Sequence, residues 1–348
     1  MRRLTHVLVA GGAVAALALA GCAAPDPKQA VDQAVEAFGS QQAATMTVKL
    51  DTTTDDLAKI SKAAGQDASN PTQSAQAAAV LKLIPQLSFT MASRAQQGSL
   101  KQADNSDKID FSARIAVGDK PIELVKVNNK GYVRADVDGL GQQSGLFTGT
   151  QVRMMLSSFA GEMPWLNELV DGKWLQIDEA SMKQFIENLA KQTASASPQA
   201  VEPSRYLAVL TTNSTVARVN DTTYTVVTDA KGLIKGLADI DPNDELTTEK
   251  ADQAIAELQD GANLDTTLTI ESGKLTKVSV DLADIIRTWF KPAEGSKGDM
   301  LRRLQAEQFT LKGVAELSDK AEITEPAGAT TIPAKDLERL LGGAAGPR

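Results

Sequence analysis

Cys22 is the residue of this 348-residue chain whose position most clearly predicts covalent chemistry. It stands directly behind the small pair Ala20-Gly21, which ends a short apolar stretch, Val7–Leu19. The pair Arg2-Arg3 gives the chain a positively charged start. Because an apolar stretch this short does not span a bilayer as a permanent helix, it predicts an export signal that is cleaved.

Small residues immediately before a cysteine resemble the bacterial lipobox, in which the cysteine receives a diacylglyceryl thioether and becomes the mature N-terminus. We therefore expect residues 1–21 to be a signal peptide, residues 22–27 a lipidated tether and residues 28–348 a single domain. The expected location is the extracytoplasmic face of the cell membrane, held there by acylated Cys22. The alternatives are a secreted protein with a chance cysteine and an unusual transmembrane anchor.

The remaining residues leave few routes to catalysis. His6, the only histidine, lies in the expected signal peptide, and Cys22 is the only cysteine. The mature chain would then lack imidazole and free thiol, which removes Ser-His-Asp and Cys-His catalysis and the usual zinc, copper and haem ligand sets. No nucleophile-elbow or phosphate-loop motif occurs. We expect no cofactor, no metal and no enzyme activity; a hydrolase that uses carboxylates alone is the third-ranked alternative.

One acidic stretch could in principle bind calcium. Residues 239–244 begin like an EF-hand loop, but the sixth position is Asp244 where glycine is needed, and the twelfth is Lys250 where glutamate is needed. A solvated loop before a helix that starts near Thr247 is the better interpretation. The formal net charge of −8 also disfavours binding to phosphate backbones, so no nucleic-acid partner is expected.

Apolar residues alternate with polar ones along much of the chain, which predicts antiparallel strands linked by hairpins. Asn128-Asn129-Lys130-Gly131 is a strong hairpin signal, and two further turns are expected at Asn220-Asp221 and Ser272-Gly273. Between the strands lie amphipathic helices; the first has Asp26 as N-cap, Pro27 at its first position and one apolar face, Val31, Ala34, Val35 and Phe38. No β-α-β alternation of a doubly wound sheet appears, so we expect an α+β fold built on one large curved sheet.

A cluster of large, soft apolar side chains is the main candidate for a ligand site. Hydrophobic residues make up 42% of the chain but aromatic residues only 4%, so aliphatic residues and methionines must dominate its interior. The candidate residues lie in two expected helices and their surroundings: Met154, Met155, Phe159, Met163, Trp165, Phe185 and Ile186. They either fill a core or line an apolar cavity. Both interpretations can hold for different members.

The layout resembles that of the LolA/LppX-type lipoprotein carriers of actinobacteria. The matching segments are a short helix at 203–210, a hairpin at 214–228, a turn and strand at 272–280, a last strand that runs into 323–326, and the strand starts at 131–133 and 172–175. The chain departs from the family by additional material at 55–84 and by a long polar loop at 291–299.

This resemblance implies a half-open antiparallel β-barrel with helices packed on its concave face. It also implies an apolar cavity that holds the acyl chains of a lipid or acylated glycolipid. We therefore expect a membrane-anchored lipoprotein that binds or carries lipid without catalysis. The second hypothesis is an envelope interaction protein with a filled core that recruits a protein partner.

Overall fold

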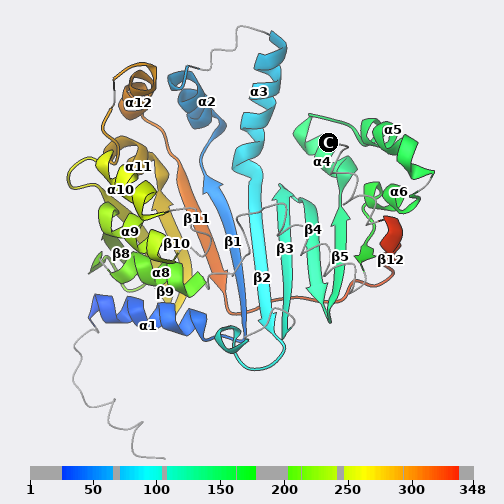
Figure 1. Ribbon diagram of the computed structural model, residues 1–348, viewed down its shortest axis with the longest axis horizontal. Helices are drawn as coiled ribbons and strands as arrows, with labels where there is room; N and C mark the ends of the chain where they lie inside the picture. Colours follow the sequence, from blue (N-terminus) through cyan, green and yellow to red (C-terminus); the bar gives the residue numbers. More distant parts are fainter. Residues whose placement is uncertain are drawn as a thin grey trace, which may run out of the picture.

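The computed structural model describes residues 26–65, 71–103, 108–161, 163–177, 203–212, 214–240, 247–292 and 294–336. Twelve strands of these residues form one sheet in the order β12-β6-β5-β4-β3-β2-β1-β11-β10-β9-β8-β7 (Figure 1). All neighbouring strands are antiparallel except β12 and β6, which are parallel. The sheet is open, with β12 and β7 at its two ends.

In chain order the strands are β1 (Ala43–Asp51), β2 (Leu87–Ala95), β3 (Ile109–Val117), β4 (Lys120–Val127), β5 (Lys130–Ala135), β6 (Leu175–Ile177), β7 (Ser214–Arg218), β8 (Thr223–Asp229), β9 (Asn263–Glu271), β10 (Lys274–Asp281), β11 (Lys312–Ser318) and β12 (Thr330–Thr331). The described α-helices are α1 (Pro27–Gly39), α2 (Thr54–Ala63), α3 (Pro71–Leu83), α4 (Val137–Ser144), α5 (Gly149–Ala160), α6 (Trp165–Val170), α8 (Pro203–Thr212), α9 (Ala230–Ile240), α10 (Thr248–Ala256), α11 (Leu282–Thr288) and α12 (Ser296–Ala306).

Two tight turns set the register of the hairpins that the sequence predicts. Asn128 and Asn129 both adopt positive φ, 52° and 61°, between β4 and β5. Ser272 and Gly273 do the same, at 53° and 77°, between β9 and β10. Two consecutive positive φ angles match the right-handed twist of the flanking strands, and asparagine and glycine tolerate them best. Both predicted hairpins are therefore confirmed.

Helix α1 forms as its sequence predicts. The Asp26 carboxylate accepts a hydrogen bond of 2.8 Å from the backbone N–H of Lys28 and so caps the helix start. All four residues of the predicted apolar face, Val31, Ala34, Val35 and Phe38, are buried. Val31, Ala34 and Val35 pack with strand residues such as Tyr224, Val226 and Leu268.

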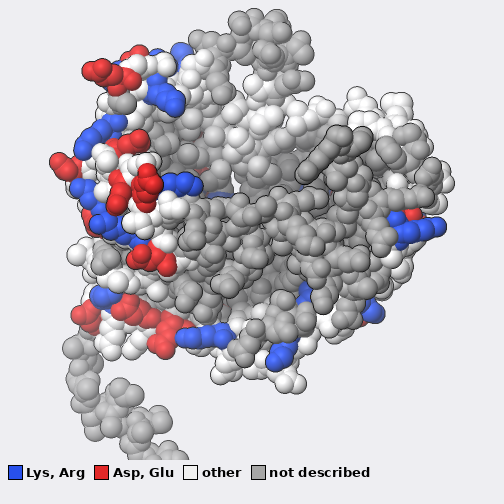
Figure 2. All heavy atoms as spheres, viewed as in Figure 1, with Lys and Arg blue, Asp and Glu red and all other residues white. Residues whose placement is uncertain are grey.

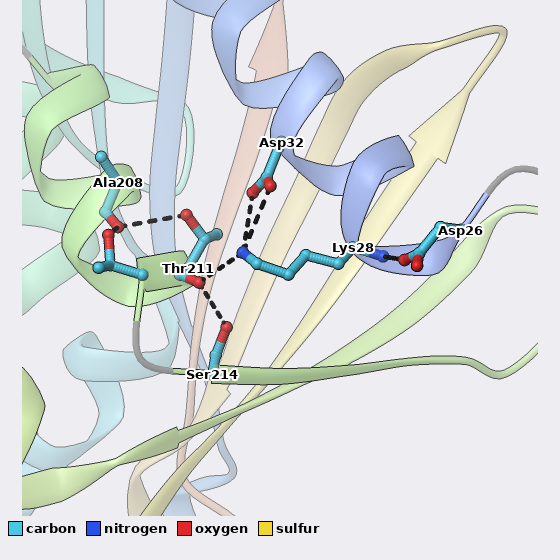
Figure 3. Close-up of polar contacts among 7 residues, drawn as sticks. Asp26, Lys28, Asp32, Ala208, Thr211 and Ser214 are labelled. Atoms are coloured by element: carbon cyan, nitrogen blue, oxygen red, sulfur yellow. Dashed lines mark hydrogen bonds and ion pairs between the residues drawn. The ribbon is translucent and has the colours of Figure 1, made fainter.

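A lysine joins α1 to α8 (Figure 3). The Lys28 ammonium donates to the carbonyl oxygen of Thr211, at 3.0 Å, and forms an ion pair with Asp32, at 3.3 Å. The Thr211 carbonyl also accepts from the Ser214 hydroxyl, at 2.8 Å. It lies in the last turn of α8, where helical carbonyls lack helical donors and a cation is favoured.

Most of the helices cover the sheet in two groups, at its two ends, whereas α2 and α3 lie beyond the ends of the central strands β1 and β2 (Figure 1). At the β7–β11 end, α1 packs on Val278 of β10 and Leu317 of β11, and a further cluster joins Leu233 of α9 to Leu264 and Val280. At the β4–β6 end, Trp165 and Leu166 of α6 pack with Leu124, Val133 and Leu175. The strand residues that both groups contact point to one face of the sheet, defined here as the apolar face.

The expected fold class is confirmed: the chain has an α+β fold with an open, largely antiparallel sheet and helices on one face. One detail of the expectation is wrong. The polar segment 291–299 is not wholly a loop, since α12 begins at Ser296 and carries Asp299 in its first turn. A carboxylate there is stabilised by the positive end of the helix dipole, so polar composition and helix are compatible.

No helix in the described part of the chain is long and apolar enough to cross a membrane. Cys22 and the expected signal peptide lie outside the described residues. Residues 241–246 of the calcium-loop candidate lie outside them as well; α10 begins at Thr248, with Thr247 as its N-cap.

Candidate functional site

The central strands expose a row of large apolar side chains on the apolar face. The row contains Leu87, Phe89 and Met91 of β2, Ile115 of β3 and Ile122 of β4, with exposed fractions from 36% for Phe89 to 49% for Ile115. We call these five residues the central apolar strip. Phe89 lies directly opposite Ile115, and Ile115 lies directly opposite Ile122. Directly paired residues share a face, so the strip is continuous across three strands.

The neighbouring strands extend the strip with half-buried residues. Met46 and Val48 of β1 pair with Met91 and Phe89, and Val48 pairs on its other side with Ala315 of β11. With about 4.8 Å between strands, the apolar surface from β11 to β4 is about 19 Å wide. Along a strand, residues i to i+4 span about 13 Å. This surface is long enough for an extended hydrocarbon chain.

The exposure of the strip follows from where the two helix groups sit. Equivalent positions at the ends of the sheet are buried, for example Leu268 at 3% and Leu175 at 0% exposed. Between these ends, β1, β2 and β3 lie in the interval that separates the two helix groups (Figure 1). A contiguous row of exposed large apolar side chains is unfavourable in water and typically marks a binding surface.

The apolar cluster that the sequence predicts as a ligand site contains both exposed and buried side chains. Met154 and Met155 of α5 are 63% and 70% exposed, whereas Met163 and Trp165 are buried. Met163 and Trp165 pack with Leu175, Ile177 and Ile332. The Trp165 indole N–H donates to the buried carboxylate of Asp336, at 3.2 Å. These two residues thus have core neighbours in the described structure.

Phe159 belongs to α5, and its side chain lies outside what the structure describes. Phe185 and Ile186 also lie outside the described residues. That any of the seven residues contacts a ligand stays a prediction. The central apolar strip was missed as a site because alternation in a strand predicts a buried face and does not show which strands remain uncovered.

The opposite face of the central strands, the polar face, carries an ordered row of polar side chains. Thr90, Arg114, Glu123 and Arg134 lie opposite one another in turn on β2, β3, β4 and β5. The Glu123 carboxylate is held between two guanidinium groups: it forms an ion pair with Arg114, at 3.6 Å, and a close one with Arg134. Arg134 in turn lies 4.8 Å from the ring centroid of Trp174.

A segment near the C-terminus is fixed to this polar face. We call residues 319–329 the C-terminal strap. The Glu325 carboxylate accepts hydrogen bonds from the Tyr132 hydroxyl at 2.5 Å, the Lys130 ammonium at 2.9 Å and the Asn128 amide at 3.3 Å. These donors stabilise the charged form and lower the pKa of Glu325 to about 2. Ile323 of the strap is buried against Ala92, Val125 and Tyr132.

Many charged side chains of the described residues lie on the helices, away from the central apolar strip. On the face shown in Figure 2, acidic and basic side chains intermingle over α1 and over α9–α12. Groups of three or more His, Cys, Asp or Glu residues that could hold a metal ion are not found in the described part of the chain.

No protein-family model matches this chain, and no curated protein sequence matches it. Several solved structures are similar to it, among them two mycobacterial proteins. LprF from Mycobacterium bovis is 11% identical with a TM-score of 0.33, over 88% of this chain and 99% of LprF. The Mycobacterium tuberculosis lipoprotein LppX is 9% identical with a TM-score of 0.30, over 87% of this chain and 100% of LppX. LppX gives its name to the carriers that the sequence resembles.

Proposed function

We propose that this protein is an extracytoplasmic lipoprotein, anchored to the membrane through acylated Cys22, that binds or carries the acyl chains of a lipid or acylated glycolipid without catalysis. One observation carries the proposal: five large apolar side chains are exposed side by side on the central strands, between helices that bury the same face toward the two ends of the sheet. A hydrocarbon chain is the ligand that matches a long, uncharged surface of this kind.

The free energy of binding should favour long acyl chains over short ones. Each buried methylene contributes about 0.8 kcal/mol, and association costs at least about 4 kcal/mol in lost translational and rotational freedom. Burial of about five methylenes therefore only matches the lower end of that cost. We expect chains well beyond this length to bind and short ones to fail.

The first test is chain length. Purified protein is examined by native mass spectrometry for lipid that remains bound, and delipidated protein is then titrated with fatty acids of 6, 10, 12, 14 and 16 carbons. We expect a bound lipid, no measurable binding of the shortest acid, and affinity that rises up to about fourfold for each added methylene.

The second test places the ligand on the strip. Ile115→Asp introduces a charge at the centre of the strip, at a residue already 49% exposed, so the fold should tolerate it. We expect palmitate affinity to fall at least about tenfold, because a carboxylate under an acyl chain loses its hydration. Val219→Asp is the matched control: Val219 is 62% exposed and lies beyond the end of β7, outside the strip. Met155→Asp tests the helix cluster in the same assay.

Unchanged palmitate binding by Ile115→Asp, or protein that carries no lipid and binds no fatty acid, would rule out this site. The envelope interaction hypothesis would then be favoured, with the strip as a surface for a protein partner. Anchoring is tested separately: Cys22→Ser should release the protein from the membrane fraction and remove the acyl mass from its N-terminus.

A further inference from the structure

A pocket of about 560 Å³ lies on the polar face, on the other side of the sheet from the central apolar strip. Its floor is formed by side chains of β1 to β4, among them Thr90, Arg114 and Glu123. Trp174 and the C-terminal strap, including Lys320 and Glu322, also line it. Pockets that bind small molecules typically have volumes of about 300–1,000 Å³.

The pocket and the strip cannot hold the same part of one ligand. Thr90 follows Phe89 along β2, and Arg114 precedes Ile115 along β3. Successive residues of a strand point to opposite faces, so the thickness of the sheet separates the two surfaces. The pocket is therefore a second site, independent of the one proposed for acyl chains.

The charges that line the pocket are mixed. Arg114 and Lys320 are cationic, and Glu123 and Glu322 are anionic. A simple anion would meet two carboxylates, and a simple cation would meet an ammonium and a guanidinium. An acyl chain would offer no polar partner to any of these four charged groups. A neutral ligand with many donors and acceptors matches such a lining best.

Glu123 is a fixed acceptor within this lining. Its side chain is 19% exposed and lies between the guanidinium groups of Arg114 and Arg134, which hold its orientation. Arg114 is 39% exposed, and its contact to Glu123, at 3.6 Å, uses one of its five N–H donors, which leaves donors for a ligand. The hydroxyls of Ser112 and Thr324 lie in the same lining. Adjacent acceptors and donors of this kind match the vicinal hydroxyl groups of a sugar ring.

We propose that the polar-face pocket binds a neutral carbohydrate of one or two sugar units, either free or at the end of a larger glycan. The apolar lining residues Ala92, Val125 and Ile323, together with the Trp174 ring, supply surface for the C–H groups of the sugar. Glu123 and Arg114 orient its hydroxyls. The site does not depend on the lipid-binding function.

The test uses the mature protein and three neutral disaccharides, maltose, cellobiose and trehalose. Saturation-transfer NMR and tryptophan fluorescence, to which Trp174 contributes, should report saturable binding of at least one of them. Glu123→Gln keeps the side-chain shape but removes the charged acceptor, and we expect about tenfold weaker binding. Glu322→Gln is a second variant at an exposed strap position, where a folding defect is not expected.

Lys49→Met is the matched control. Lys49 is on the same face and pairs with Glu316, at 2.6 Å, but it does not line the pocket. It should bind the disaccharide as the parent protein does. The proposal is overturned if none of the three sugars binds, if phosphate or glycine betaine binds in their place, or if both Glu123→Gln and Glu322→Gln bind sugar with unchanged affinity.

Discussion

Glu325 illustrates how a single surface carboxylate can tie a chain segment to the sheet. Its three donors, Tyr132, Lys130 and Asn128, come from β5 and from the turn that precedes it. Burial, together with the contact to the Glu325 carboxylate, raises the pKa of the Tyr132 hydroxyl. The segment thus depends on a charge that acid removes.

The pKa of Glu325 predicts an acid-sensitive contribution to stability. Its ordinary value is 4.5 and its value in the folded protein is about 2. The contribution is fully present above pH 4.5 and is lost as the pH falls toward 2, because the unfolded chain takes up the proton first. We expect Glu325→Gln to lower the melting temperature at pH 7, with the difference from the parent protein vanishing near pH 2.

Thermal unfolding between pH 2 and pH 7 measures this difference. Glu322→Gln provides the control, since Glu322 lies in the same strap and forms no ion pair with another described residue. A melting-temperature difference for Glu325→Gln that stayed constant over this range would contradict the assigned charge. Added salt should reduce the difference at pH 7, because the Glu325 side chain is 40% exposed.

At the scale of elements, α1 links the expected tether to the sheet. Its apolar face enters a cluster built from β8, β9 and β10, and Lys28 joins it to the end of α8. We expect Val31→Ala, at a residue with 0% exposure, to destabilise the protein by about 2–3 kcal/mol, through lost burial and the space left behind.

Chemical denaturation measures the change in free energy of unfolding. Val219→Ala removes the same two methyl groups at a side chain that is 62% exposed, and it should change stability by less than about 0.5 kcal/mol. Equal effects of the two substitutions would mean that α1 does not pack on the sheet as the structure shows.

Local signals explain why these elements were predictable from the sequence. The cap and apolar spacing of α1, and the turns at Asn128 and Ser272, are each encoded within a few residues. The start of α12 inside a polar segment was not predicted, since its helix signal is weak: Gly298 lies within it and the residues around are polar. Short polar helices are fixed by what they pack against.

The two candidate surfaces were harder to predict, for a reason that lies beyond any local pattern. The pocket on the polar face joins residues from Thr45 to Pro326, and no segment of the sequence brings them together. The central apolar strip has the alternation of a buried strand face. The strip is exposed because helices from other parts of the chain cover the sheet on both sides of it and do not cover the strip itself.

At the scale of the whole molecule, strands from the N-terminal and C-terminal parts of the described chain pair with one another in the sheet. β1, the first strand, lies between β2 and β11, and β12 from the C-terminal part pairs with β6. Neither half of the sheet can separate without breaking the pairing of β1 with β2 or with β11. This arrangement supports the proposal of a single domain over residues 28–348 and predicts cooperative unfolding.

Hydrogen exchange tests that cooperativity without any substitution. β4 and β8 lie inside the two opposite parts of the sheet, each with a strand on both sides. If β1 and β11 couple these parts, the slowest amides of β4 and β8 should exchange with the same free energy and the same dependence on denaturant, because both need global unfolding. Amides of the edge strand β7 should exchange faster, as it pairs with β8 alone. Protection of β8 that disappears at lower denaturant than that of β4 would show two units that unfold separately, and the acyl-chain strip would then lie next to the junction between them.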